Sequence, residues 1–102
     1  MSQKRNRVEW FYRDLQNWIN NGCDKNVAKQ VKRLDISDNK LINIPIEISN
    51  LTQLKKFDCS CNQITEIPKE IFNLKITFLK LSVSEIRLYI LQITNKLEIL
   101  LL

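Results

Sequence analysis

The chain has 102 residues, 44% of them hydrophobic, and a net charge of +5. This length fits one domain, the hydrophobic content excludes a disordered polymer, and one glycine with two prolines is too few turn residues for a compact all-β fold of tight hairpins. The excess of basic over acidic residues favours acidic proteins, nucleic acid or anionic lipid as partners. Such an excess, however, more often reflects only a solvated surface.

Residues 1–30 are predicted to form a helical cap. Apolar residues recur there at helical spacing: Val8, Phe11, Tyr12, Leu15, Trp18 and Ile19. Gly22 suits a left-handed stop, and Asp24 suits the N-cap of a second short helix that runs towards Gln30. As a cap, this segment packs Trp18 onto the residues that follow and leaves Trp10 at least half exposed. The alternative is a separate contact site made by Trp10 and the basic cluster at 4–7.

The same segment bears on localisation. Residues 1–20 contain no apolar stretch of signal-peptide length, and no later run of apolar residues is long enough to span a membrane. The three cysteines lack the spacing of a disulfide framework, which fits free thiols in a reducing compartment. We therefore expect a cytoplasmic, intracellular protein without a signal peptide and without membrane association.

From residue 31 the sequence repeats with a period of 23 residues. The matching positions are Val31, Leu34, Ile36, Asn39, Leu41, Ile44, Pro45, Ile48 and Leu51, which fall on Leu54, Phe57, Cys59, Asn62, Ile64, Ile67, Pro68, Ile71 and Leu74. Such a period is the signature of a repeat architecture, in which each unit buries its apolar face against its neighbours.

Segments 31–41 and 54–64 resemble the leucine-rich repeat, L-x-x-L-x-L-x-x-N-x-L. The Ile-Pro-x-x-Ile at 44–48 and 67–71 is similar to the 23-residue class of intracellular signalling and scaffold proteins. The richness in Ile, Lys and Asn resembles short proteins of protists and of the large DNA viruses that infect them. The resemblance implies an α/β solenoid: a right-handed superhelix with a short parallel β-sheet of about three to four repeats.

Elementary chemistry supports the same architecture. Alternating Leu34 and Ile36 predict a short strand with one buried face, and successive strands stack in parallel about 4.8 Å apart. Inward Asn39 and Asn62 are predicted to form an asparagine ladder, each bonding amides of its own and the neighbouring turn that would otherwise cost roughly 1–3 kcal/mol when buried unpaired. After each proline, an i, i+3 apolar pair predicts one helical or 3₁₀ turn on the outer side.

The predicted repeats are 31–53, 54–75 and 76–96, followed by a partial copy at 97–102. The third copy keeps apolar positions after a one-residue slip, but Ser84 stands where the asparagine should be, so we expect a looser turn. Its Ile-Pro pair is also missing, and Tyr89, Ile90 and Ile93 are expected to fill the inner space instead.

The outward strand positions line the concave face in this family, and the resemblance implies that they bind protein. These residues are Arg33, Asp35, Ser37, Asp38, Lys56, Asp58, Ser60, Cys61, Phe78 and Lys80. Phe78 is the expected anchor, because an exposed aromatic is a poor choice for a bare surface. Asp35 and Asp58 should form a mildly repulsive pair that Arg33 and Lys56 compensate. The alternative interpretation is that these residues form a solvated sheet surface that binds no partner.

Catalysis, metal binding and cofactors are not expected. The absence of histidine removes the commonest general base and zinc ligand, and a single glycine cannot build a phosphate loop. Cys59 occupies a core position, whereas Cys61 falls at an outward position and could be an accessible thiol.

The leading hypothesis is a non-enzymatic protein–protein interaction module that binds an unidentified intracellular protein through its concave face. The alternative is a truncated relic or fragment of a longer leucine-rich-repeat protein that self-associates as a homodimer through an uncapped C-terminal edge strand at 97–102. Nucleic-acid binding ranks last, because the sequence lacks an aromatic-lined basic groove.

Overall fold

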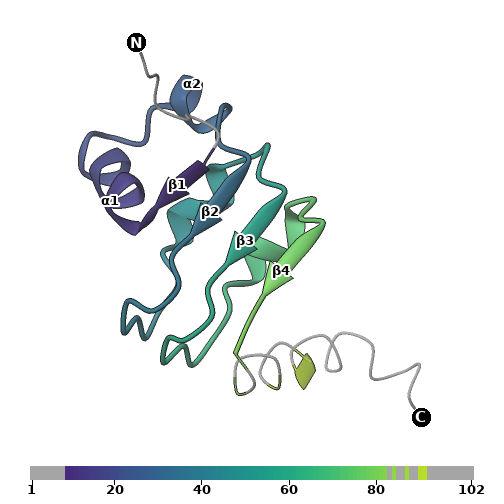
Figure 1. The fold of residues 1–102 in the computed structure, drawn as a ribbon. Helices are drawn as coiled ribbons and strands as arrows, with labels where there is room; N and C mark the ends of the chain where they lie inside the picture. The colour runs from purple at the N-terminus through teal and green to yellow at the C-terminus, as the bar shows by residue number, and fades with distance from the viewer. Residues whose placement is uncertain (1–8, 83, 85–86, 88–89, 92–102) are drawn as a thin grey trace.

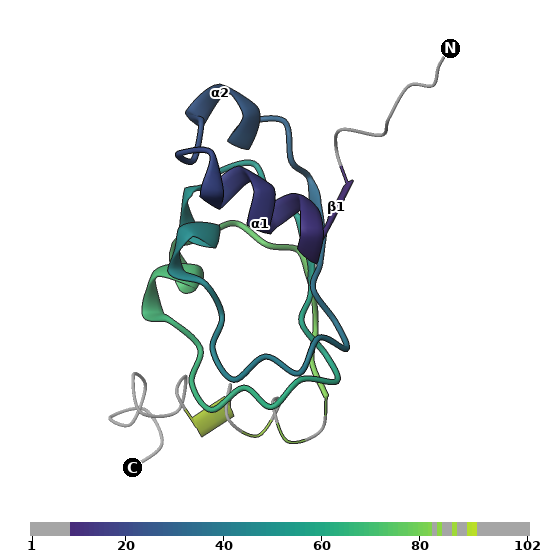
Figure 2. The ribbon, with the colours of Figure 1, turned by 90° about the vertical axis from the view of Figure 1, so that its left-hand side faces the viewer.

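The computed structural model describes residues 9–82 together with 84, 87, 90 and 91. In chain order the elements are β1 (Glu9–Phe11), α1 (Tyr12–Asn20), α2 (Lys25–Ala28), β2 (Arg33–Asp35), the 3₁₀ helix η1 (Ile46–Asn50), β3 (Lys56–Asp58), the 3₁₀ helix η2 (Lys69–Asn73) and β4 (Phe78–Lys80). The four strands form one parallel sheet in the order β1-β2-β3-β4 (Figure 1). Figure 2 shows the strands on one side of the molecule and η1 and η2 on the opposite side.

The predicted stacking of the repeats is confirmed by the strand register. Leu34 pairs with Phe57, and Phe57 pairs with Leu79, at spacings of 23 and 22 residues. The second spacing is the one-residue slip expected from the sequence. Leu34 and Phe57 are each only 1% exposed, so this row of side chains forms part of the core.

The return segments close the core from the opposite side. The backbone N–H of Ile48 donates to the carbonyl of Pro45 at 3.2 Å, and that of Ile71 donates to the carbonyl of Pro68 at 3.0 Å. Each proline cannot donate a hydrogen bond and so begins a new turn, which here is 3₁₀. Ile48 and Ile71 are buried in the common cluster. The predicted single turns on the outer side are therefore confirmed.

The start of the predicted N-terminal helix is wrong. Residues 9–11 form strand β1, which places Trp10 directly beside Leu34 in the parallel register. Trp10 is 9% exposed rather than at least half exposed, and its ring centroid lies 5.8 Å from that of Trp18. An indole buried on the first strand gains more from leaving water than it would on a wet helix face, and β1 also satisfies the backbone edge of β2.

The rest of the N-terminal segment follows the prediction. Leu15 and Trp18, on one face of α1, are buried in the core, and the helix lies across the β1 end of the stack (Figure 2). Gly22 has a φ of +96°, and the N–H of Cys23 donates to the carbonyl of Trp18 at 3.0 Å, which ends the helix. The side chain of Asp24 accepts hydrogen bonds from the first turn of α2, as expected of an N-cap.

The third repeat departs from the first two. Leu79 and Leu81 are only partly buried, and Ser84 is exposed in helical backbone rather than in a turn like that of Asn39. Ile90 is 53% exposed, so the expectation that it fills the inner space is wrong. Ser84 has no amide group with which to bridge two turns as Asn62 does. Tyr89, Ile93 and the partial copy at 97–102 lie outside the described residues.

Within the described part of the chain, no helix is long and apolar enough to cross a membrane.

Candidate protein-binding face

The strands turn alternate side chains away from the core, and these form one surface that we call the sheet face. The register arranges them in two rows across the strands. The first row is Glu9, Arg33, Lys56 and Phe78, and the second is Phe11, Asp35, Asp58 and Lys80. The structure thus brings together the six predicted strand residues and adds two from β1 that the sequence analysis did not include.

Two phenylalanines stand out on this face. Phe78 is 54% exposed and Phe11 is 55% exposed, one on each outermost strand of the described sheet. They belong to different rows, so their backbone positions are roughly 15 Å apart. Large exposed aromatic rings are typical anchors of protein interfaces. The expectation that Phe78 is exposed on the sheet face is confirmed.

The two aspartates of the second row hold the turns that follow their strands. Oδ1 of Asp35 accepts hydrogen bonds from the backbone N–H of Ser37 at 3.0 Å and from its hydroxyl at 2.6 Å. Asp58 makes the same contacts with Ser60, at 3.0 Å and 2.7 Å. Ser60 is only 6% exposed, so its prediction as a contact residue is wrong: its hydroxyl turns to the aspartate instead of to solvent.

Asp38 and Cys61 occupy equivalent positions in the turns beyond β2 and β3. Both are exposed, and both have left-handed backbone, with φ values of 57° and 56°. They therefore lie at the end of the sheet face where the chain turns away. Cys61 is exposed and Cys59 is buried, as predicted.

The asparagine ladder is confirmed between the first two turns. Oδ1 of Asn62 accepts hydrogen bonds from the backbone N–H groups of Asn39 and Leu41, each at 2.9 Å. Its amide nitrogen donates to the carbonyls of Ile36 and Cys59, each at 3.0 Å. One side chain therefore fixes two successive turns and, through them, the relative position of β2 and β3.

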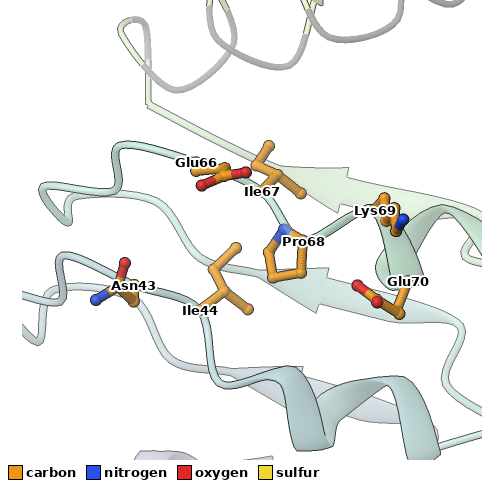
Figure 3. Close-up of a pocket in the computed structure, with 7 residues that line it drawn as sticks. All are labelled: Asn43, Ile44, Glu66, Ile67, Pro68, Lys69 and Glu70. Atoms are coloured by element: carbon orange, nitrogen blue, oxygen red, sulfur yellow. The ribbon is translucent and has the colours of Figure 1, made fainter.

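A shallow pocket of about 420 Å³ lies between the two return segments, which are joined by a parallel bridge from Asn43 to Glu66 (Figure 3). Its lining combines apolar and charged side chains: Asn43, Ile44, Glu66, Ile67, Pro68, Lys69 and Glu70. No residue of the sheet face lines it. Among the described residues, no group of three or more metal-binding side chains comes together there or elsewhere.

Phe11 is one of the two sheet-face residues that sequence reasoning missed, the other being Glu9. Helical spacing assigned Phe11 to the buried side of a helix, whereas it ends a strand whose buried residue is Trp10. A weak signal was available: Glu9 is a charged residue between apolar Val8 and Trp10, which is the two-residue alternation of a strand.

Stacked parallel strands, asparagine-bridged turns and 3₁₀ returns define a repeat protein of the α/β solenoid class. Residues 29–73 match the family model described as leucine rich repeats, in two copies. These residues carry leucine-rich repeats, and domains of this family generally mediate protein–protein interactions. None of the curated proteins and none of the solved structures compared with the chain gives a match. The assignment to the 23-residue signalling class stays a prediction.

Proposed function

We propose that this chain is a non-enzymatic interaction module that binds another protein on its sheet face, with Phe11 and Phe78 as anchors. The observation that carries the proposal is the exposure of these two rings on an otherwise polar surface. Apolar area buried at an interface contributes roughly 25 cal/mol per Å², and aromatic anchors are where interfaces concentrate their energy. The three cysteines form no disulfide bond with one another, which supports an intracellular setting for this interaction.

The proposal includes a structural role for residues 9–28 as the cap of a right-handed solenoid of three to four repeats. β1 pairs with β2 and covers its edge, while Leu15 and Trp18 of α1 join the core cluster. A solenoid needs such an end, because its first repeat would otherwise expose apolar surface. Right-handed connections between parallel strands are the general rule.

The test is affinity capture from cells with two matched double variants. Phe11→Ala/Phe78→Ala removes the exposed rings of the sheet face, and Ile42→Ala/Ile46→Ala removes two side chains of similar exposure, 55% and 52%, outside it. The first variant should lose the proteins that the wild-type chain retains, and the second should keep them, with circular dichroism unchanged in both. If the isoleucine variant alone loses them, the binding surface is not the sheet face.

Self-association through the β4 end of the sheet is a second candidate. Leu79 and Leu81 are partly buried, whereas Phe57 and Cys59 at the equivalent positions of the previous repeat are 1% and 0% exposed. A second copy that covered this end would bury the remaining apolar area. Light scattering over a range of concentrations tests this: a dimer that Leu81→Lys converts to a monomer supports it, and a wild-type monomer at high concentration refutes it.

A further inference from the structure

Four basic residues lie close together at the start of β2 and β3 and immediately before these strands. We call them the basic patch: Lys32, Arg33, Lys55 and Lys56. Arg33 pairs with Lys56, and the carbonyl of Lys32 accepts hydrogen bonds from the backbone N–H groups of Lys55 at 2.8 Å and Lys56 at 3.0 Å. Adjacent strands lie about 4.8 Å apart and successive residues about 3.3 Å apart, so the backbone positions of these four residues fall within one small area.

Two of the three acidic side chains in the rows of the sheet face, Asp35 and Asp58, hold the turns that follow their strands, and the third, Glu9, lies opposite Arg33 on β1. Asp35 and Asp58 are partly buried, and each carboxylate accepts two hydrogen bonds from the serine of its own turn. Arg33, Lys55 and Lys56, in contrast, are exposed. Where β2 and β3 begin, the four cations outnumber the carboxylate of Glu9, so the net charge that this end of the sheet face presents to a partner is positive.

The basic patch is unfavourable for the isolated fold, because like charges at directly opposite positions of neighbouring strands repel each other. The paired aspartates have a structural reason for their position, since they fix the turns. Glu9, opposite Arg33 on β1, offsets part of the repulsion, whereas Lys56 lies between Arg33 and Phe78 and has no acidic residue directly opposite it in the register. An anionic ligand that spans β2 and β3 would relieve the repulsion between Arg33 and Lys56 on binding, which makes the patch better suited to a complex than to the free protein.

An aromatic ring borders the patch. Lys56 pairs with Phe78 in the register, and the backbone N–H of Thr77 donates to the carbonyl of Lys55 at 2.8 Å. The half-exposed ring of Phe78 thus continues the row of Arg33 and Lys56 on the next strand. A ligand lying across the strands would meet two cations and then an apolar surface, which fits a peptide with carboxylates beside an apolar side chain.

We propose that the basic patch and Phe78 bind an acidic segment of a partner protein, with carboxylates over Arg33 and Lys56 and an apolar side chain against Phe78. This inference rests on the proposed function, because it specifies the partner chemistry of the same sheet face. Charge complementarity then contributes to the choice of partner and to the rate of association.

The experiment uses the full chain and a fluorescent synthetic peptide in which several glutamates flank one leucine, with fluorescence anisotropy as the readout. The wild-type chain should bind this peptide about tenfold more tightly than a matched peptide with glutamine in place of glutamate. Added salt should weaken the interaction, because the Debye length falls from roughly 10 Å at 0.1 M to roughly 3 Å at 1 M. Equal binding of the two peptides overturns the proposal.

Two charge-reversal variants locate the site. Arg33→Glu/Lys56→Glu should weaken binding about tenfold or more, while Lys29→Glu/Lys69→Glu, which makes the same change in net charge at exposed positions outside the patch, should have little effect. Arg33→Gln/Lys56→Gln repeats the test with a milder change if the first variant does not fold. Equal losses in both charge-reversal variants mean a nonspecific response to net charge and overturn the proposal.

Other anions distinguish the source of the negative charge. Tighter binding of a single-stranded oligonucleotide, or of vesicles containing phosphatidylserine, with the same dependence on Arg33 and Lys56, overturns the assignment to a protein segment. If no acidic peptide binds while cellular capture still depends on Phe11 and Phe78, the proposal of an acidic partner segment is refuted, and the proposal that the sheet face binds a protein is retained. If capture does not depend on these rings, the proposed function itself fails.

Discussion

The side-chain oxygen of Asn62 accepts a hydrogen bond from the backbone N–H of Asn39, 23 residues earlier, at 2.9 Å. The same oxygen accepts a second hydrogen bond from Leu41, while the amide nitrogen of Asn62 donates to carbonyls of both turns. Asn39 donates only to carbonyls near its own turn, those of Ile36 and Ser37. The two asparagines of the ladder therefore differ in how many turns they join.

This difference predicts unequal losses of stability. Asn62→Ala should lower the free energy of unfolding by about 3 kcal/mol, because backbone groups of two turns lose their partners, whereas Asn39→Ala should lower it by about 1 kcal/mol. Urea denaturation followed by circular dichroism measures both. Gln63→Ala is the control, since its exposed side chain should contribute less than about 0.5 kcal/mol. Equal losses for the two asparagine variants would contradict the bridging role of Asn62.

The burial of Trp10 gives a second prediction. Trp10→Ala should destabilise the fold by about 3–5 kcal/mol, because it removes a core side chain from beside Leu34 and Trp18. Phe11→Ala, one residue later on the opposite face of β1, should change stability by less than about 1 kcal/mol. The same denaturation experiment compares them. A small loss of stability for Trp10→Ala together with a large loss for Phe11→Ala would contradict strand β1 and favour the predicted helix in this segment.

The centre of the fold could be predicted because the repeat is regular there. A 23-residue period with alternating Leu34 and Ile36 admits one simple solution, parallel strands that share a core, and the register confirms it. The asparagine ladder follows for the same reason: a turn that leaves the core needs donors and acceptors, and Asn39 and Asn62 recur where they are required.

The two ends of the repeat array are harder to predict, because the sequence patterns that indicate secondary structure conflict at the first end and are missing at the second. Residues 8–19 fit a helical period almost throughout, and a three-residue strand is too short to compete as a pattern, so Trp10 and Phe11 were assigned to the wrong sides. Beyond β4, spacing alone predicts a third repeat at 76–96 with Ile90 in its interior, although Ser84 replaces the asparagine and the Ile-Pro pair is missing; Ile90 is 53% exposed. At the sheet face, alternation predicted Phe78 but not the way Ser60 turns inward to Asp58.

Thiol reactivity provides a third prediction. Cys61 is exposed and should react rapidly with a thiol reagent in the folded protein, whereas Cys59 is 0% exposed and should react only after unfolding. Mass spectrometry of briefly labelled native protein distinguishes the two after proteolysis. Cys61→Ala is the control and should remove the fast labelling of this position, leaving the partly exposed Cys23 as the remaining site of native labelling. Rapid native labelling of Cys59 would mean that the core at this repeat is open.

The left-handed turn position of Asp38 gives a fourth prediction. With φ at 57°, Asp38→Gly should stay within about 0.5 kcal/mol of wild type, because glycine accepts this conformation while increasing the freedom of the unfolded chain. Asp38→Val should cost about 1–2 kcal/mol, because a β-branched side chain is strained there. Thermal unfolding measures the order of the three proteins. A valine variant as stable as the glycine variant would contradict the turn geometry.

The central claim is that a partner protein rests on the sheet face, and site-specific photo-crosslinking in cells tests it most directly. A photoreactive phenylalanine analogue is placed at Phe11 or Phe78, or at Ile42 as the comparison position outside the sheet face. Crosslinks from positions 11 and 78 to the same protein, with none from position 42, are the result we predict. Crosslinks to that protein from position 42 alone would contradict the account.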